Sequence, residues 1–472
     1  MGLSGPAGVV CRGHAARPVR GPGRPHPWAG ALSALNGASV PRSQTGSAGA
    51  GIPVGELHFD PPKEHDMGIR RSQTRALVAT EQALGHALMA VRRAWAAGIA
   101  DLQDFGAAEF DPEPLTLYDL NGEPLFHEFR CLAGTREVGR VKAAASRLVG
   151  SPVVSIERGP RSWDAARAVE MAVAAAKKAY PRQAVAAKEL VCYSYPKIGV
   201  RVQIGGDKGA SAIFDVADGS QVEQFGADAA DGQCSWSFLD TIGVPALEDR
   251  LRRFDEHDKE MEAARASTPE MFAKAYTARE LVAVRAKLIL PSDYIKIPFY
   301  SSKVLSFGPR CSPHDCFELY AQQTNVYCAV ATGQMILDFY RYPFEQTAIA
   351  AAMGTGATGT SFAGQETGYE TLSNGCLDAG HDFSADWTEA KAEIDANRPL
   401  KSGIPGHARA CAGWKRQNIS LVGVPPKRWL QIYDPWPWNA DLCSGGAVYW
   451  EDWDAVTHTN FCYVRHASSA HA

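Results

Sequence analysis

Helical and strand-like hydrophobic patterns alternate along the chain from residue 70 onward. The first pattern is helical, because its apolar residues recur three or four positions apart and form one stripe. The members of this stripe are Leu77, Leu84, Leu88, Val91 and Trp95. Residues 115–129, LTLYDLNGEPLFHEF, then alternate apolar and polar positions around an Asn-Gly pair. Because Asn-Gly is favoured in two-residue hairpin turns, this stretch predicts two antiparallel strands.

The same order of elements recurs in the next part of the chain. Residues 164–180, DAARAVEMAVAAAKKAY, predict a second helix that ends before Pro181, and residues 211–225, SAIFDVADGSQVEQF, predict a second hairpin. We therefore predict two small modules, each of one helix and an antiparallel sheet, at residues 70–160 and 161–240. Their order of elements and their turn motif resemble the PepSY-type modules found in propeptides of some secreted peptidases.

Three further segments complete the predicted organisation. Residues 1–66 are dominated by Gly, Pro, Ala and Arg without periodicity, and Glu56 is their first acidic residue, so we expect a disordered segment. An acid-free, arginine-rich start is also typical of a transit peptide, and Met67 is an alternative start of translation. Residues 241–293 predict a charged helical connector, and residues 294–468 predict an aromatic-rich C-terminal domain.

A helical stripe in the C-terminal domain begins at a cysteine. Its members are Cys328, Ala331, Thr332, Met335, Ile336 and Phe339. One interpretation makes Cys328 the first buried residue of a core helix, because free cysteines are often buried. The other makes it a nucleophile, because the positive end of the helix dipole favours the thiolate form.

A histidine and an aspartate follow in an order that suits such a nucleophile. His407 comes after Gly406 at the start of a predicted strand, and Asp434 precedes Pro435 at the end of another. Taken singly, His407 is most simply a structural residue and Asp434 a turn former. Taken with Cys328, they supply a base and a group that holds the base in one orientation.

An oxyanion donor completes a pattern that resembles a known family. Gln322 lies six residues before Cys328, and its amide and the backbone N–H of Cys328 are two candidate donors. The order Gln-x5-Cys, Gly-His, Asp-Pro resembles papain-like cysteine peptidases, in the branch related to peptidase domains of bacteriocin-processing transporters and to bacterial cysteine-protease effectors. This resemblance covers about residues 295–466 and implies an α+β fold with a helical lobe and an antiparallel β lobe. It implies Cys328 as nucleophile and Gln322 as oxyanion donor. It also implies His407 as general base and acid, and Asp434 as the residue that orients it.

The sequence departs from that family beside the nucleophile. Ala329 follows the cysteine where the family usually has Gly or Trp, and Gln323 doubles the glutamine and is an alternative oxyanion donor. The leading hypothesis is a hydrolase that cleaves peptide bonds through a thioester, with the N-terminal modules covering the site as a propeptide-like inhibitor. It predicts self-cleavage between about residues 240 and 300. The alternatives are an idle papain-like protein that binds partners, favoured by Ala329, and an amine-accepting acyl transferase of transglutaminase type.

A cluster of cysteine and histidine residues raises a metal hypothesis. Cys311, His314 and Cys316 lie within six residues of each other, and Cys376 and Cys443 are the candidates to complete a set. A structural zinc ion usually takes four ligands at characteristic spacings. Because Cys376 and Cys443 do not have such spacings, we predict neither a metal nor a cofactor.

Composition narrows the classes of partner. The 472 residues are 45% hydrophobic and 21% charged, as in globular proteins, and the net charge of −4 gives no reason to expect a nucleic acid or an anionic membrane as partner. No apolar run is long enough for a membrane-spanning helix. The 11 cysteines are odd in number and irregularly spaced, which favours mostly reduced thiols. We expect a peptide or protein substrate. With no signal peptide visible, a cytoplasmic location is the default, whereas the family resemblance favours export.

Overall fold

The computed structural model describes residues 76–206, 209–222, 231–232, 235–242, 244–273, 276, 279–280, 300–305, 317–418 and 426–467. The predicted disordered segment and the cluster of Cys311, His314 and Cys316 lie outside these residues. Among the described residues, no helix has both the length and the apolar character needed to cross a membrane.

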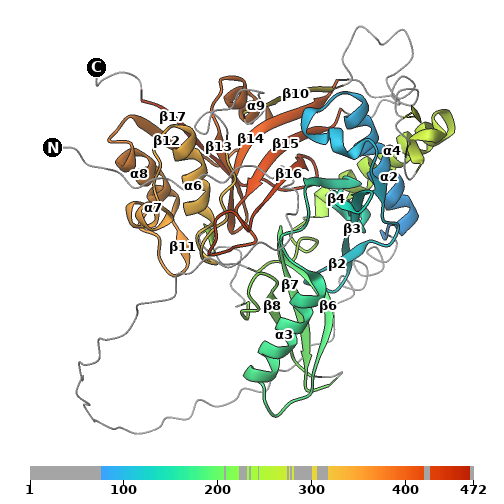
Figure 1. The fold of residues 1–472 in the computed structure, drawn as a ribbon, viewed down its shortest axis with the longest axis horizontal. Helices are drawn as coiled ribbons and strands as arrows, with labels where there is room; N and C mark the ends of the chain where they lie inside the picture. Colours follow the sequence, from blue (N-terminus) through green and yellow to red (C-terminus); the bar gives the residue numbers. More distant parts are fainter. Residues whose placement is uncertain are drawn as a thin grey trace, which may run out of the picture. The chain divides into compact units, whose positions relative to one another are not determined.

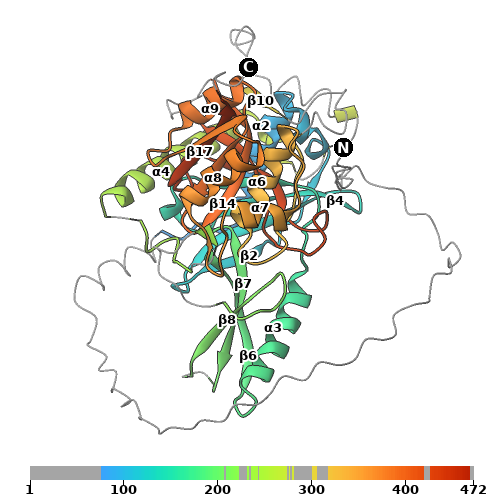
Figure 2. The ribbon, with the colours of Figure 1, turned by 90° about the vertical axis from the view of Figure 1, so that its left-hand side faces the viewer.

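The N-terminal half contains two successive groups, each of a long helix followed by strands (Figure 1). The first group consists of α2 (Thr80–Ala96), η1 (Ala100–Phe105), β1 (Glu109–Phe110), β2 (Leu115–Asp119), β3 (Pro124–Ala133), β4 (Arg136–Ala144), η2 (Arg147–Val149) and β5 (Val153–Arg158). The second group consists of α3 (Ala165–Ala179), β6 (Val185–Ser194), β7 (Lys197–Ile204) and β8 (Ser211–Asp215). Both predicted helices and the first hairpin are confirmed, and Gly122 in the hairpin turn has a φ of 88°, which glycine adopts without strain. Helix α3 lies along β6, β7 and β8 (Figure 2).

The connector and the C-terminal part follow. The elements between β8 and the cysteine helix are β9 (Asp231–Gly232), α4 (Val244–Ser267), η3 (Pro269–Phe272) and β10 (Tyr300–Val304). The helices after them are α6 (Cys328–Phe339), α7 (Gln346–Ala352), α8 (Phe362–Leu372) and α9 (Trp387–Asp395). The strands are β11 (Gly359–Thr360), β12 (Leu377–Asp382), β13 (Leu400–Ile404), β14 (His407–Gln417), β15 (Arg428–Asp434), β16 (Ala447–Asp452) and β17 (Asn460–His466).

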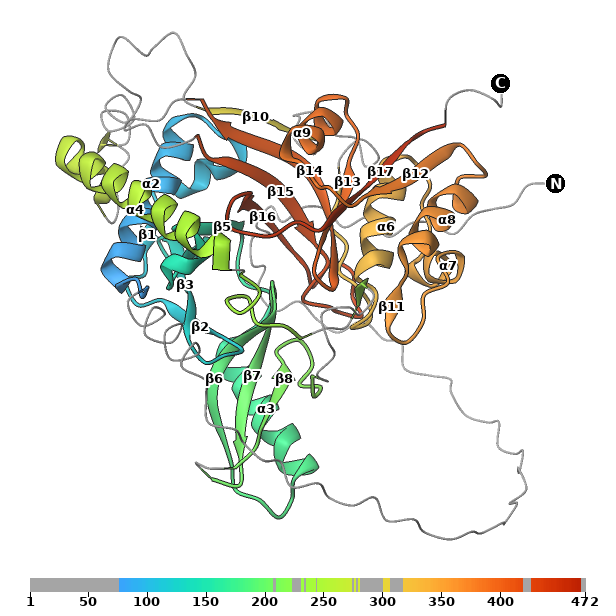
Figure 3. The same ribbon diagram turned by 180° about the vertical axis from the view of Figure 1, so that it is seen from behind.

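One 15-stranded sheet runs through both halves of the chain (Figure 3). Its strand order is β12-β17-β13-β14-β15-β16-β5-β4-β3-β2-β6-β7-β8, with β1 added on β3 and β10 on β14. The halves join where β16 pairs with β5, with Trp450 opposite Ile156. Strands β2 and β6 pair in parallel, whereas the other pairs of this sheet are antiparallel. The predicted α+β class is confirmed in part: helices and strands form a mixed α/β arrangement with one large mixed sheet, and the two predicted modules share this sheet with the C-terminal part.

A hydrophobic core follows the junction of the two halves. Trp429 and Trp450 are buried and cluster with apolar side chains of α2, η1 and β3–β5. The carboxylate of Asp101, in η1, accepts hydrogen bonds from Trp450 Nε1 at 2.7 Å and from Gln431 Nε2 at 2.9 Å. A buried carboxylate with two donors from the other half ties η1 to β15 and β16.

A second core fixes the helix that begins with the cysteine. Helix α6 packs on α7 and α8 on one side and on β14 on the other. In Figure 1 the three helices stand together beside the strands β13, β14 and β17. The N-terminus of α6 is therefore held against the part of the sheet from which His407 and Asp434 come.

Candidate active site

The three predicted catalytic side chains stand at the ends of three elements. Cys328 begins α6, His407 begins β14 and Asp434 ends β15. A tight turn at Gly406, whose φ is 63°, joins β13 to β14 and places His407 at the start of its strand. Because β14 and β15 are antiparallel neighbours, the start of the first lies beside the end of the second, and His407 Nε2 is 2.7 Å from Asp434 Oδ1.

The histidine is bound through one ring nitrogen only. His407 Nδ1 is buried and has no hydrogen-bond partner among the described residues. Burial lowers the pKa of His407 below its ordinary value, although the Asp434 carboxylate opposes this effect. Burial also acts to raise the pKa of Asp434, but the charge and hydrogen bond of His407 outweigh it, so that pKa is lowered and the carboxylate stays ionised.

The cysteine thiol lies beside the strand that begins with the histidine. Cys328 forms a small buried cluster with Ala329 and with Ala408, which directly follows His407. The residue before the helix, Tyr327, makes no side-chain cap. The Tyr327 side chain thus does not occupy the first backbone N–H groups of α6, which as at any helix N-terminus lack an acceptor within the helix.

The glutamine stretch is attached to the chain that follows the aspartate. The backbone N–H of Gln322 donates to Pro435 O at 3.0 Å, and its C=O accepts from Asn439 N at 2.9 Å. The Gln322 side chain is buried, and its Nε2 donates to Thr324 O at 2.7 Å. Gln323 is half-buried, and its backbone binds Gln346 Oε1 at 2.9 Å. Both glutamines stay candidates for the oxyanion donor.

The three predicted catalytic side chains are buried. The exposed fraction is 0% for Cys328 and His407 and 1% for Asp434. Trp236, near the end of the second predicted module, lies close to this site, because its Nε1 donates to Pro405 O at 3.2 Å, two residues before His407. Strand β9 lies here as well, because it pairs with β11 and contacts both α6 and β14.

Four buried polar residues behind the pair were not predicted. They are Tyr195 from the second module and Arg409, Tyr449 and Glu451 from β14 and β16. The signal that the sequence offers for two of them is a charge at an inward position of an apolar strand, as with Arg409 in HARACAGW and Glu451 in AVYWED. Such charges are almost never fully buried unless they are paired.

The cysteines bear on the metal hypothesis. Six described cysteines are free thiols, and Cys443 is disulfide-bonded. A disulfide sulfur is not a thiolate ligand, so Cys443 does not complete a zinc set around Cys311, His314 and Cys316. Within the part of the chain that the structure describes, no group of three or more His, Cys, Asp or Glu residues is placed to hold a metal.

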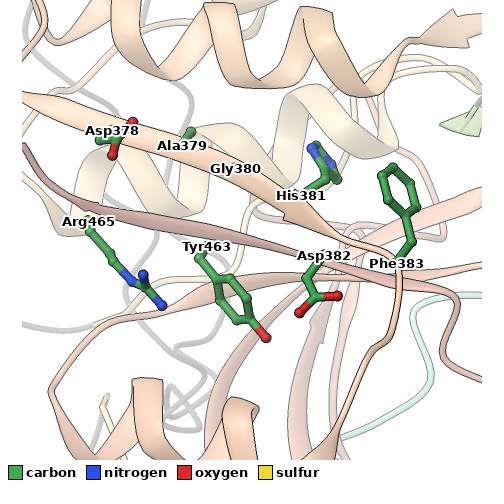
Figure 4. Close-up of a pocket in the computed structure, with 8 residues that line it drawn as sticks. All are labelled: Asp378, Ala379, Gly380, His381, Asp382, Phe383, Tyr463 and Arg465. Carbon is green, nitrogen blue, oxygen red and sulfur yellow. The ribbon is translucent and has the colours of Figure 1, made fainter.

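A surface hollow is formed by residues other than the candidate catalytic side chains. It has a volume of about 580 Å³ and is formed by β12 and β17, where Tyr463, Arg465 and Asp382 point to one side of the strands (Figure 4). His381 and Phe383 stand on the other side in that view. None of the predicted site residues contributes to this hollow.

Comparisons with known proteins identify the C-terminal part. Residues 314–455 match the model of the Peptidase_C39 like family. Among solved structures, the peptidase domain of Streptococcus ComA, a bi-functional ABC transporter of a quorum sensing pathway, matches with 13% identity and a TM-score of 0.22. The match covers 32% of this chain and 99% of that one. A comparison with curated proteins gives no match. The PepSY-like resemblance of the modules stays a prediction. The resemblance found in the sequence is thus confirmed for the C-terminal part: residues 314–455 are similar to the Peptidase_C39 like family, which indicates a cysteine peptidase.

Proposed function

We propose that the chain hydrolyses peptide bonds through a triad of Cys328, His407 and Asp434. The observation that carries the proposal is the buried 2.7 Å hydrogen bond between His407 Nε2 and Asp434 Oδ1. Because Asp434 occupies Nε2, Nδ1 is the ring nitrogen that remains to exchange a proton with a thiol. The Cys328 thiol, packed against the residue after His407, is the one in place to do so.

The chemistry follows from this arrangement. The Cys328 thiolate attacks the peptide carbonyl carbon, and the oxyanion accepts hydrogen bonds from the N-terminal amide of α6 and from a side-chain amide, with Gln322 as first candidate. The His407 imidazolium then gives its proton to the amide nitrogen as the C–N bond breaks, which leaves an acyl thioester. Water attacks the thioester while His407 takes a proton, and the carboxylate product leaves as the thiol forms again.

The segment around β9 and Trp236 supports the hypothesis of a propeptide-like inhibitor. Its start pairs with Gly359 and Thr360 in β11, between α6 and β14. Its end is held by the buried carboxylate of Asp119, which accepts hydrogen bonds from the backbone N–H groups of Phe238 at 2.8 Å and Leu239 at 3.2 Å. A segment that is fixed at both ends and lies beside the candidate catalytic residues would exclude substrate until it moves. The full chain is therefore latent toward peptide and protein substrates.

Site-resolved alkylation at about pH 5.5 tests the triad. We expect Cys328 to react with iodoacetamide at least roughly tenfold faster than the buried Cys192 and Cys462, since an ion-paired thiolate stays reactive where ordinary thiols are protonated. Burial raises the pKa of both reference thiols to about 12. In His407→Ala the rate at Cys328 should fall to theirs. Mass spectrometry of each cysteine-containing peptide gives the rates.

If the C-terminal domain is catalytically idle, we expect a different pattern of alkylation rates. A Cys328 rate that equals those of Cys192 and Cys462, or that His407→Ala leaves unchanged, would sink the triad and favour the partner-binding alternative. Thermal unfolding of the variant checks that a lost rate does not reflect a lost fold.

Releasing the covering segment tests its role as an inhibitor. Trp236→Ala removes the hydrogen bonds of Nε1 to Pro405 O and to Ser194 Oγ and the stacking of the indole on Phe238. Because local opening then costs less free energy, we expect alkylation of Cys328 to accelerate by roughly 10- to 100-fold. Hydrolysis of a fluorescein-labelled unfolded protein should increase in parallel.

The matched control for this experiment is Trp163→Ala. Trp163 is a half-buried tryptophan of the second module that stacks under Arg161. It should leave the Cys328 rate unchanged. If both variants accelerate alkylation equally, the effect is general loosening, and the segment at Trp236 is not a specific cover.

A further inference from the structure

The hydrogen bonds of the catalytic pair continue into the sheet behind it. Asp434 Oδ1 accepts from His407 Nε2 and from the backbone N–H of Trp436 at 2.9 Å. Its second oxygen, Oδ2, accepts from the hydroxyl of Tyr449, on the neighbouring strand β16, at 2.7 Å. The carboxylate is therefore held at both oxygens, and Tyr449 alone among the described side chains holds Oδ2.

The orientation of the tyrosine hydroxyl is set from behind. Arg409 Nη1 donates to Tyr449 Oη at 3.2 Å and to Glu451 Oε2 at 2.6 Å. Because a guanidinium only donates, Tyr449 Oη accepts from Arg409, and its own proton is directed to Asp434. Burial, followed by the charge of Asp434, raises the pKa of Tyr449 well above that of a free tyrosine, so the donor keeps its proton.

The last member of the chain of hydrogen bonds belongs to the second N-terminal module. The Tyr195 hydroxyl donates to the same Glu451 oxygen at 2.9 Å. The side chains of Arg409 and Glu451 are fully buried, so each depends on its few partners for its position. The order Tyr195–Glu451–Arg409–Tyr449–Asp434–His407 thus connects a residue of the module with the catalytic imidazole.

We propose that Tyr449 and Tyr195 are positioning residues for the His407–Asp434 pair, so that the second module is a working part of the catalytic centre. The proposal rests on the proposed triad. Tyr449 holds the Asp434 carboxylate toward His407, and Tyr195 holds the Glu451–Arg409 pair that directs the Tyr449 hydroxyl. Neither tyrosine touches the substrate or the thiol in this arrangement.

Other charged groups near the His407–Asp434 pair also influence the pH dependence of Cys328 alkylation. Arg409 on β14 lies near both members of the pair, and Lys197 on β7 acts on His407. Asp215 on β8 reaches the same region, because Trp436 Nε1 donates to its Oδ2 at 3.4 Å. The Tyr449→Phe and Tyr195→Phe substitutions leave all of these charges in place, so a shifted profile reports the hydroxyl groups.

The pH profile of Cys328 alkylation in the full-length chain tests the proposal. Removing a donor from Asp434 disfavours its charged form, so in Tyr449→Phe the acid limb should move up by roughly one pH unit, which lowers the rate on the limb about tenfold. Tyr195→Phe should move it the same way by a smaller amount. In the double variant the shift should equal that of Tyr449→Phe alone, because both hydroxyls act along one chain.

Tyr340→Phe is the matched control, because the Tyr340 hydroxyl donates to Val464 O, outside this chain. It should leave the acid limb in place. A wild-type thiol without fast alkylation overturns the triad and this proposal together. A fast wild-type thiol whose acid limb stays fixed in both tyrosine variants, or shifts that add in the double variant, overturns the positioning role alone. Thermal unfolding curves separate a merely destabilised variant from a mispositioned pair.

Discussion

Replacing Cys328 with alanine is expected to abolish hydrolysis, with a loss of roughly 10⁴-fold or more, as when the nucleophile of a catalytic triad is removed. The reason is that no other described thiol lies at a helix N-terminus beside His407, the proposed base. Among the free cysteines, Cys131, Cys192, Cys411 and Cys462 are buried in strands, and burial raises the pKa of each thiol. The measurement is hydrolysis of a labelled unfolded protein by Trp236→Ala and by the Trp236→Ala, Cys328→Ala double variant.

The matched control is the same Cys→Ala substitution at a different buried cysteine. Cys462→Ala also removes one buried sulfur, from β17, and should lower activity by less than about threefold while destabilising the fold to a similar extent. Hydrolysis that persists without the Cys328 sulfur would assign the nucleophile to another residue. The same assay with an added primary amine separates hydrolysis from acyl transfer, because an amine acceptor leaves an amide product in place of a carboxylate.

The local elements of the fold were predictable because their signals are local. The stripe that begins at Cys328, the Asn-Gly turn and the stop before Pro181 each specify an element through residues a few positions apart. The pairing of β16 with β5 joins residues almost 300 positions apart. The parallel pairing of β2 with β6 is not made through a hairpin turn, so no turn motif in the sequence indicates it. No periodicity within a segment carries such information, so the modules were expected as separate units and the shared sheet was not.

The residues of the candidate site also fall into two groups, those with a local sequence signal and those without one. Cys328, His407 and Asp434 could be selected as candidates because each ends or begins an element and because their order resembles a family. The residues behind them were missed because their meaning depends on three-dimensional contacts. Arg409 and Glu451 are ordinary charges in the sequence, and only the shared sheet brings Tyr195 to them.

Two kinds of contact between the halves have opposite expected effects on activity. The segment at β9 and Trp236 is the proposed cover of the candidate catalytic residues, so its release should increase activity. The strands β5–β7 and Tyr195 complete the sheet and the chain of hydrogen bonds behind Asp434, so their loss should decrease it. On the proposed function, a propeptide-like cover and a permanent structural part would lie within the same N-terminal region, and we expect any activating cleavage to leave the second part bound.

Expressing residues 294–472 without the N-terminal half is therefore expected to give a chain that does not fold cooperatively and has no activity. Its β16 would become an unpaired edge, Trp429 and Trp450 would lose the core they share with α2 and β3–β5, and Trp450 Nε1 would lose its partner Asp101. Exposing two large buried aromatic side chains alone costs about 3–5 kcal/mol each, a large part of the stability of an ordinary domain. Circular dichroism and thermal unfolding measure the fold, and co-expression of residues 67–293 as a separate chain is the control that should restore both fold and Cys328 reactivity.

If residues 294–472 unfold cooperatively by themselves and alkylate at Cys328 as fast as the full chain does, the N-terminal half is dispensable. The junction at β5 and β16 would then be a docking contact and not a part of the catalytic centre.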